Sequence, residues 1–119
     1  MSTRSEAAER LALQQGTLDL LILRTLLFRP EHGQGIARNI QQTSREVILV
    51  EHGSLYPALQ RLEAQRLVRA EWGVSENGRR ARYYELTPLG RKELAAATSR
   101  WRAMTAAIGR VLGPARAEG

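Results

Sequence analysis

The sequence contains no cysteine and no long apolar run free of charged residues. Without cysteine the chain can form neither a disulfide framework nor a zinc site with thiolate ligands. The most apolar stretch, residues 18–28, includes Asp19 and Arg24 and is too short to span a bilayer. The N-terminus also lacks the features of a signal peptide. We therefore expect a soluble, cytoplasmic protein with no membrane partner.

Lysine is almost absent as well, because Lys92 is the only one in the chain. Lysine and arginine together number 18 against 12 acidic residues, which gives a formal net charge of +6 carried mainly by arginine. Arginine binds a phosphate or a guanine edge through two parallel hydrogen bonds, although arginine richness also arises from genomic base composition. The charge balance favours a polyanionic partner such as double-stranded DNA.

Histidine is scarce too, and the residues present do not form a catalytic or metal-binding pattern. His32 and His52 each stand beside a glutamate in the sequence. Neighbouring side chains point to different sides of a helix or strand, and no third ligand or nucleophile lies at a useful spacing. We assign both histidines to structural or solvent-exposed positions, and we predict no enzyme activity, no metal site and no cofactor.

The length of 119 residues suits one compact domain with an appended element. Residues 1–87 are expected to form that domain. Within them, apolar periodicity predicts helices over residues 5–14, 17–28 and 35–43, with Gly16 separating the first two and Thr17 capping the second. The second helix is expected to bury a broad apolar surface that reaches Phe28. The β-branched run at residues 47–50 predicts a short strand.

A fourth helix is predicted over residues 54–65. Ser54 suits the N-cap, and Pro57 would lie in the first turn, where a missing amide proton has little effect. Leu55, Leu59 and Leu62 follow the helical repeat and turn one face inward. The opposite face is polar and free to meet a ligand.

A β-hairpin is predicted after this helix. Residues 68–74 alternate apolar and polar side chains, residues 75–78 supply turn chemistry, and residues 81–86 return as the second strand. The tip carries Arg79, Arg80 and Arg82. These arginines either bind phosphate or line a solvated turn, and their clustering beside an Asn-Gly turn favours phosphate.

The last predicted element is a long helix over residues 88–112, which begins at a Thr-Pro pair typical of a helix start. Residues 113–119 are expected to form a frayed tail. One face of the helix carries apolar residues with heptad spacing, and a monomer of this size cannot easily bury them. The sequence therefore predicts a dimer interface that consists of Leu94, Ala97, Trp101, Met104, Ile108 and Val111.

This order of elements predicts a mainly α fold with a small β-hairpin, namely a winged helix-turn-helix plus a long C-terminal dimerisation helix. Several short motifs within this fold point to a particular family. The run from Gly53 to Leu59, followed by Tyr84 and by Leu86-Thr87 with Leu89-Gly90, resembles the PadR family of bacterial transcriptional regulators. The resemblance implies a homodimeric, repressor-like protein that binds a pseudo-palindromic DNA operator sequence-specifically. The alternative is a winged-helix protein-interaction module that does not bind DNA.

The resemblance also implies which residues touch DNA: Ser54, Tyr56, Pro57, Gln60 and Arg61 on the recognition helix, and Arg79, Arg80 and Arg82 on the wing. Tyr56 can instead pack its ring against the helix over residues 17–28. Some members of the family hold a flat hydrophobic effector at the dimer interface, which makes Trp101 a candidate for that contact as well as for the dimer core. Two residues depart from the family pattern: Gln34 replaces a frequent aromatic, and Arg66 replaces a glycine that commonly ends the recognition helix.

Overall fold

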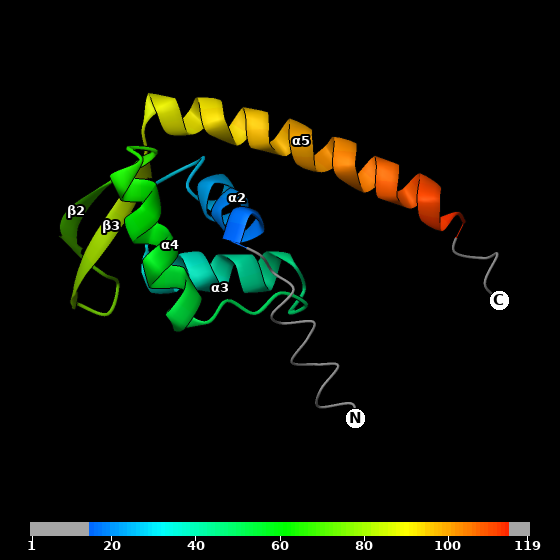
Figure 1. Ribbon diagram of the computed structural model, residues 1–119. Coiled ribbons are helices and arrows are strands. Elements are labelled where there is room, and N and C mark those ends of the chain that lie inside the picture. The colour runs from blue at the N-terminus through cyan, green and yellow to red at the C-terminus, as the bar shows by residue number, and fades with distance from the viewer. Residues whose placement is uncertain (1–14, 115–119) are drawn as a thin grey trace.

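The computed structural model describes residues 15–114, and Figure 1 shows how their helices and strands are arranged. The helix predicted over residues 5–14 and most of the predicted tail lie outside the described residues. The elements run in the order α2 (Gln15–Thr25), β1 (Glu31–His32), α3 (Gly33–Thr43), α4 (His52–Ala64), β2 (Val68–Val74), β3 (Arg80–Leu86) and α5 (Pro88–Leu112). This arrangement confirms the predicted fold class: mainly α, with a β-hairpin and a long C-terminal helix.

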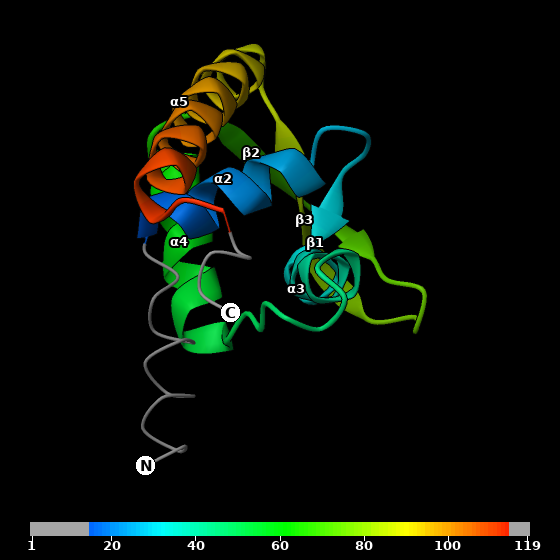
Figure 2. The same ribbon diagram turned by 90° about the vertical axis from the view of Figure 1, so that its right-hand side faces the viewer.

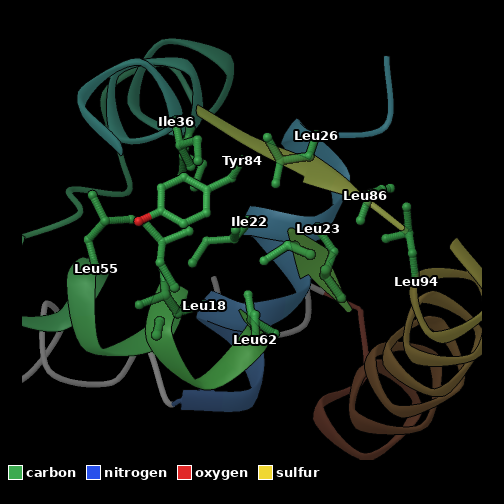
Figure 3. Packing of buried hydrophobic residues seen from close by; sticks show 14 residues of the cluster. Leu18, Ile22, Leu23, Leu26, Ile36, Leu55, Leu62, Tyr84, Leu86 and Leu94 are labelled. Carbon is green, nitrogen blue, oxygen red and sulfur yellow. The ribbon is translucent and has the colours of Figure 1, made fainter. Parts of the chain in front are cut away.

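The core forms where α2 packs against α3, α4 and α5. In Figure 3 the ring of Tyr84 lies among aliphatic side chains of the three helices α2, α3 and α4, while Leu94 of α5 closes the core near Leu86. Removing these side chains from water is the main stabilising contribution to the domain. The buried apolar cluster comprises Leu18, Ile22, Leu23, Leu26, Ile36, Ile40, Leu55, Ala58, Leu59, Leu62, Val68, Tyr84, Leu86 and Leu94.

The sheet has three antiparallel strands in the order β1-β3-β2. Glu31 and His32 of β1 pair with Tyr84 and Tyr83 of β3, so the third strand comes from the segment before α3. The prediction of a strand at residues 47–50 is wrong: the strand that completes the sheet beside β3 is β1. Residues 48–50 run as irregular chain, with Ile48 packed against the core.

Helix α2 differs from its predicted bounds. Within the described residues it spans Gln15–Thr25 and includes Gly16 and Thr17, so Gly16 does not break the helix there and Thr17 does not cap it. It ends at Thr25, and Phe28 therefore lies beyond the helix with 78% of its surface exposed. The predicted burial of Phe28 is wrong. The centroid of its ring instead lies 5.2 Å from the guanidinium carbon of Arg24.

Helix α3 begins at Gly33, earlier than predicted, because His32 caps it. The Nδ1 atom of His32 accepts a hydrogen bond from the Gly35 amide at 3.0 Å. The imidazole is buried, and its ring meets Tyr83 edge-on with centroids 5.3 Å apart. These contacts give His32 a structural role, as the sequence predicted.

The C-terminus of α4 shows how Arg66 takes the place of a helix-ending glycine. Arg66 adopts a left-handed backbone conformation with φ of 63°. Its amide donates to the Glu63 carbonyl at 2.9 Å, and the amide of Leu67 donates to the Leu62 carbonyl at 3.0 Å. These two bonds form a Schellman motif, which ends the helix cleanly even without glycine.

Helix α5 has the predicted bounds and the predicted cap, since Thr87 Oγ1 accepts a hydrogen bond from the Gly90 amide at 3.0 Å. Its first turns pack on the core, whereas its second half extends well past the other elements (Figure 1). Every residue from Ser99 to Pro114 is exposed. The radius of gyration is accordingly 16.2 Å, compared with about 13 Å for a compact domain of this size. The division of the chain at residue 87 stays a prediction.

Among residues 15–114, no helix is both long enough and apolar enough to cross a membrane.

Candidate nucleic-acid interface

Helix α4, the predicted recognition helix, begins two residues earlier than the sequence indicated. Glu51 is its N-cap residue, in an extended conformation and without a side-chain capping bond. Ser54, which was expected to cap the helix, lies inside it, and its amide donates to the Glu51 carbonyl at 3.0 Å. Pro57 therefore lies in the second turn, where it cannot donate a hydrogen bond to the Gly53 carbonyl.

The inward face of α4 is the predicted one. Leu55, Leu59 and Leu62 are almost completely buried, and they hold the helix on the core. Ser54, Pro57 and Gln60 are exposed. These three predicted DNA contacts share the open side of the helix, where small or polar side chains allow close approach of a nucleic acid.

Tyr56 lies between the open and the packed side of α4, with 40% of its surface exposed. Its ring lies against Gly33 at the start of α3, so closely that a Cβ at Gly33 would fall 2.8 Å from the ring. His52 meets the same ring edge-on, with centroids 5.7 Å apart. The ring packs against the start of α3, and its exposed edge is still available to a ligand.

Arg61 does not lie on the open face. Its Nη2 donates to Asp19 Oδ1 of α2 at 2.8 Å, and both side chains are mostly shielded from water. Burial raises the pKa of the Asp19 carboxyl above its usual value of 3.8, and the hydrogen bond and charge of Arg61 only partly oppose this rise. Arg61 thus joins α4 to α2.

The turn of the hairpin is closed by its own backbone. The amide of Ser75 donates to the Arg79 carbonyl at 2.7 Å, the amide of Gly78 donates to the Ser75 carbonyl at 2.8 Å, and Gly78 has the positive φ that such a turn requires. Arg79 and Arg80 are exposed beside this turn. The guanidinium carbon of Arg80 lies 4.5 Å from the ring centroid of Trp72, a cation–π arrangement that holds the arginine in place.

Arg82 lies farther from the tip and connects the wing to the recognition helix. Its Nη2 donates to Glu63 Oε2 of α4 at 2.9 Å. Its guanidinium carbon is also 6.0 Å from the ring centroid of Tyr84. The positive charge of Arg82 is therefore partly neutralised, and the residue braces the hairpin against α4.

A cleft of about 450 Å³ separates the hairpin from α3 and the start of α4. Its wing side carries Trp72, Arg79 and Arg80, and its helix side carries Arg38 and Tyr56. Figure 2 shows α3 nearly end-on beside the hairpin. Sequence reasoning missed Arg38 and Trp72 as candidate site residues. The only signal for Arg38 was its place on the polar side of a short amphipathic helix.

The apolar seam of α5 divides into two parts. Leu94 is only 6% exposed and belongs to the core of the single chain, so its assignment to a dimer interface is corrected. Ala97 is half-buried. The remaining predicted interface residues, Trp101, Met104, Ile108 and Val111, are exposed. An open groove of about 480 Å³ runs between α2 and α5, with Leu20 and Trp101 among its lining residues.

Two packed helices, a recognition helix with an open polar face and a basic hairpin braced against it define a winged helix-turn-helix DNA-binding domain. Residues 22–96 match the transcriptional regulator PadR-like family, and the chain belongs to that family.

Individual relatives agree with this assignment. The chain is 38% identical to the transcriptional regulator Rv3488 of Mycobacterium tuberculosis over 68% of this chain and 72% of that protein. A transcriptional regulator from Clostridium thermocellum has a TM-score of 0.75 and 28% identity over 82% of this chain and 95% of that one. A PadR family regulator from Eggerthella lenta also has a TM-score of 0.75, with 27% identity over 93% of this chain and 95% of that one. The protein is a DNA-binding transcriptional regulator, and its family is one of regulators rather than of enzymes.

Proposed function

We propose that the protein is a homodimeric repressor that binds a pseudo-palindromic operator. The observation that carries the proposal is the exposed outer half of α5. Trp101, Met104 and Ile108 stand on one side of that helix with 44%, 57% and 49% of their surfaces exposed. A soluble monomer rarely exposes a continuous apolar stripe of this length. A second copy of α5 with the same heptad spacing is the partner that this stripe fits best.

Dimerisation would give the recognition helix its selectivity. One copy of α4 reaches only a few base pairs, and two copies at fixed separation read two half-sites about 10 base pairs apart. Ala97, Trp101, Met104, Ile108 and Val111 form the proposed interface, with Leu94 supporting it from within each core.

Within each half-site, Ser54, Pro57 and Gln60 are proposed to face the major groove, with Tyr56 at its edge. Arg79, Arg80 and Arg82 are proposed to contact the phosphate backbone. Arg61 is proposed to hold α4 in position through Asp19, and it reaches a phosphate only by leaving that carboxylate.

The protein-interaction alternative is less well supported. Winged helices that bind proteins do so through an apolar or acidic recognition face, whereas the open side of α4 and the hairpin tip are polar and basic. Steep loss of binding with salt is expected only for the DNA-binding function, because neutralising phosphates releases bound counterions.

Selection of bound sequences from a random duplex pool tests the proposal directly. The expected result is a two-fold symmetric motif, bound by two protomers as measured by analytical ultracentrifugation. If six phosphates are contacted, the slope of log affinity against log salt should be roughly −5. An asymmetric motif bound by one protomer, or a slope near zero, would exclude the proposed mode. Placing the selected site over a reporter promoter then tests repression, and increased transcription would contradict it.

A small planar hydrophobic effector is a further proposal for the groove between α2 and α5, because the indole of Trp101 lines it. Quenching of Trp101 fluorescence in a Trp72→Phe variant would detect such a ligand without background from the wing. In the Trp101→Phe variant Trp72 is the remaining tryptophan, and equal quenching of its fluorescence would place the ligand elsewhere.

A further inference from the structure

The cleft between the hairpin and α3 has arginines on both of its walls. Arg38 projects from α3, whereas Arg79 and Arg80 belong to the end of the hairpin. The two walls are 41 and 42 residues apart in the sequence, counted from Arg38 to Arg79 and to Arg80. Only the packing of the sheet on α3 brings them to the same opening.

The charges of this cleft are unevenly balanced. Among the described residues, Arg82 is the only lining arginine with an ion pair, which it forms with Glu63. The only acidic side chain that lines the cleft is Glu76, within residues 15–114. Its Oε1 lies 3.9 Å from Nε2 of the buried His32, and its side chain as a whole is 74% exposed. Arg38, Arg79 and Arg80 therefore outnumber one carboxylate at the mouth.

Aromatic side chains shape the same space. Trp72 supports the Arg80 guanidinium at 4.5 Å, and the exposed edge of Tyr56 forms part of the opposite wall. Trp72 is itself 58% exposed. Guanidinium groups supported by aromatic rings are directed, weakly hydrated donors that suit phosphate oxygens.

We propose that this cleft binds the sugar-phosphate backbone of one DNA strand, with Arg38 on one side and Arg79 with Arg80 on the other. The inference rests on the proposed operator binding and deepens it: Arg38 of α3 adds a phosphate contact to those that the wing arginines were expected to make alone. Glu76 limits the affinity, because its carboxylate lies at the mouth through which the phosphates enter.

We call the arrangement of Arg38 on one side of the cleft and Arg79 with Arg80 on the other the phosphate clamp. Two substitutions with opposite expected effects test the clamp. In Arg38→Gln, loss of one phosphate contact per protomer should weaken binding of the selected operator. It should also reduce the log-log salt slope of a dimer by about 2 in magnitude. In Glu76→Gln, loss of a nearby negative charge should tighten binding by roughly two- to five-fold per half-site, the range for exposed charge pairs. A gain of affinity cannot arise from misfolding.

Arg91→Gln is the matched control, because Arg91 is an exposed arginine on α5 that does not line the cleft. It should bind like the wild type. If Arg38→Gln and Arg91→Gln have the same affinity and slope, or if Glu76→Gln does not tighten binding, the clamp is wrong while operator binding stands. If the wild type itself shows no salt-dependent binding to duplex DNA, the operator function fails and the clamp fails with it.

Discussion

The guanidinium of Arg61 donates a hydrogen bond to the carboxylate of Asp19 at 2.8 Å, across 42 positions of sequence. This contact joins the recognition helix to α2, which also packs against α5. Within the described residues, Arg61 Nε has no hydrogen-bond partner, so a single bond holds the pair. The helix proposed to enter the groove is thereby braced from the side that faces away from the hairpin.

Removing the arginine should destabilise the fold. In Arg61→Met, the partly buried Asp19 loses its partner, and we expect the free energy of unfolding to fall by about 1–2 kcal/mol. Chemical denaturation measures this change. Arg69→Met is the control, because the pair of Arg69 with Glu85 is exposed and such pairs contribute at most about 1 kcal/mol. Equal effects at both positions would show that the Asp19 pair has no special role.

The raised pKa of Asp19 predicts a pH dependence with a definite sign. Because the folded-state pKa lies above the usual 3.8, the native protein holds this proton to higher pH than the unfolded chain. The stability of the wild type relative to Asp19→Asn should therefore decrease as pH rises from 3.8 through the raised pKa. Carboxyl ¹³C titration and denaturation at several pH values measure both quantities. A titration midpoint at or below the usual value would contradict the prediction.

The cap on α3 gives a second stability prediction. His32→Ala removes the acceptor for the Gly35 amide, whereas asparagine is a good N-cap and can replace it. We expect His32→Asn to be more stable than His32→Ala by about 1 kcal/mol, the usual effect of a cap. Thermal unfolding of the two variants measures this difference. Both variants lose the imidazole ring and its packing, so the comparison between them isolates the effect of the cap. Equal stability would mean that the cap contributes nothing.

The left-handed conformation of Arg66 makes this a position where a substitution should increase the stability of the protein. Glycine adopts φ near +63° without the steric penalty of a side chain, so Arg66→Gly should stabilise the protein by about 0.5–1 kcal/mol. The backbone bonds that end α4 do not depend on the side chain. Arg66→Ala serves as the control, since alanine retains the Cβ and should give no such gain, as followed by denaturant midpoints.

The proposed dimer can be tested by placing charge on its seam. Ile108→Glu puts a carboxylate into the exposed apolar stripe and should convert the dimer to monomers, because an unpaired charge is poorly tolerated in a buried interface. Affinity for the two-half-site operator should fall by more than about ten-fold, since two linked contacts become independent. Sedimentation and anisotropy measure these effects. Ala106→Glu lies on the opposite side of α5 and should leave the dimer intact.

Elements with strong local signals were predicted well from the sequence. The alternation from Val68 to Val74 predicted β2, and the Thr87-Pro88 pair predicted the start of α5. Elements that depend on a distant partner were not. The strand at residues 31–32 is too short to show a period, and it exists because β3 offers it hydrogen bonds. The true start of α4 was also not predictable, because its N-cap residue Glu51 makes no side-chain capping bond.

In the candidate site, too, local features were predictable from the sequence and long-range contacts were not. Helical repeat and charge identified the open face of α4 and the arginines of the wing, because side-chain type and spacing are local properties of the chain. The sequence could not show that Arg61 is held by Asp19, that Arg82 is held by Glu63, or that Leu94 belongs to the core.

The sequence by itself therefore determined the order of the helices and the hairpin among the described residues, the polarity of most of their faces and the family. The tertiary structure alone decided which arginines have their charge neutralised by a partner and which stand across the cleft from one another. The physical reason is that an ion pair depends on the distance between two charges. That distance, for residues tens of positions apart, is set only when the helices and the sheet pack around a shared core.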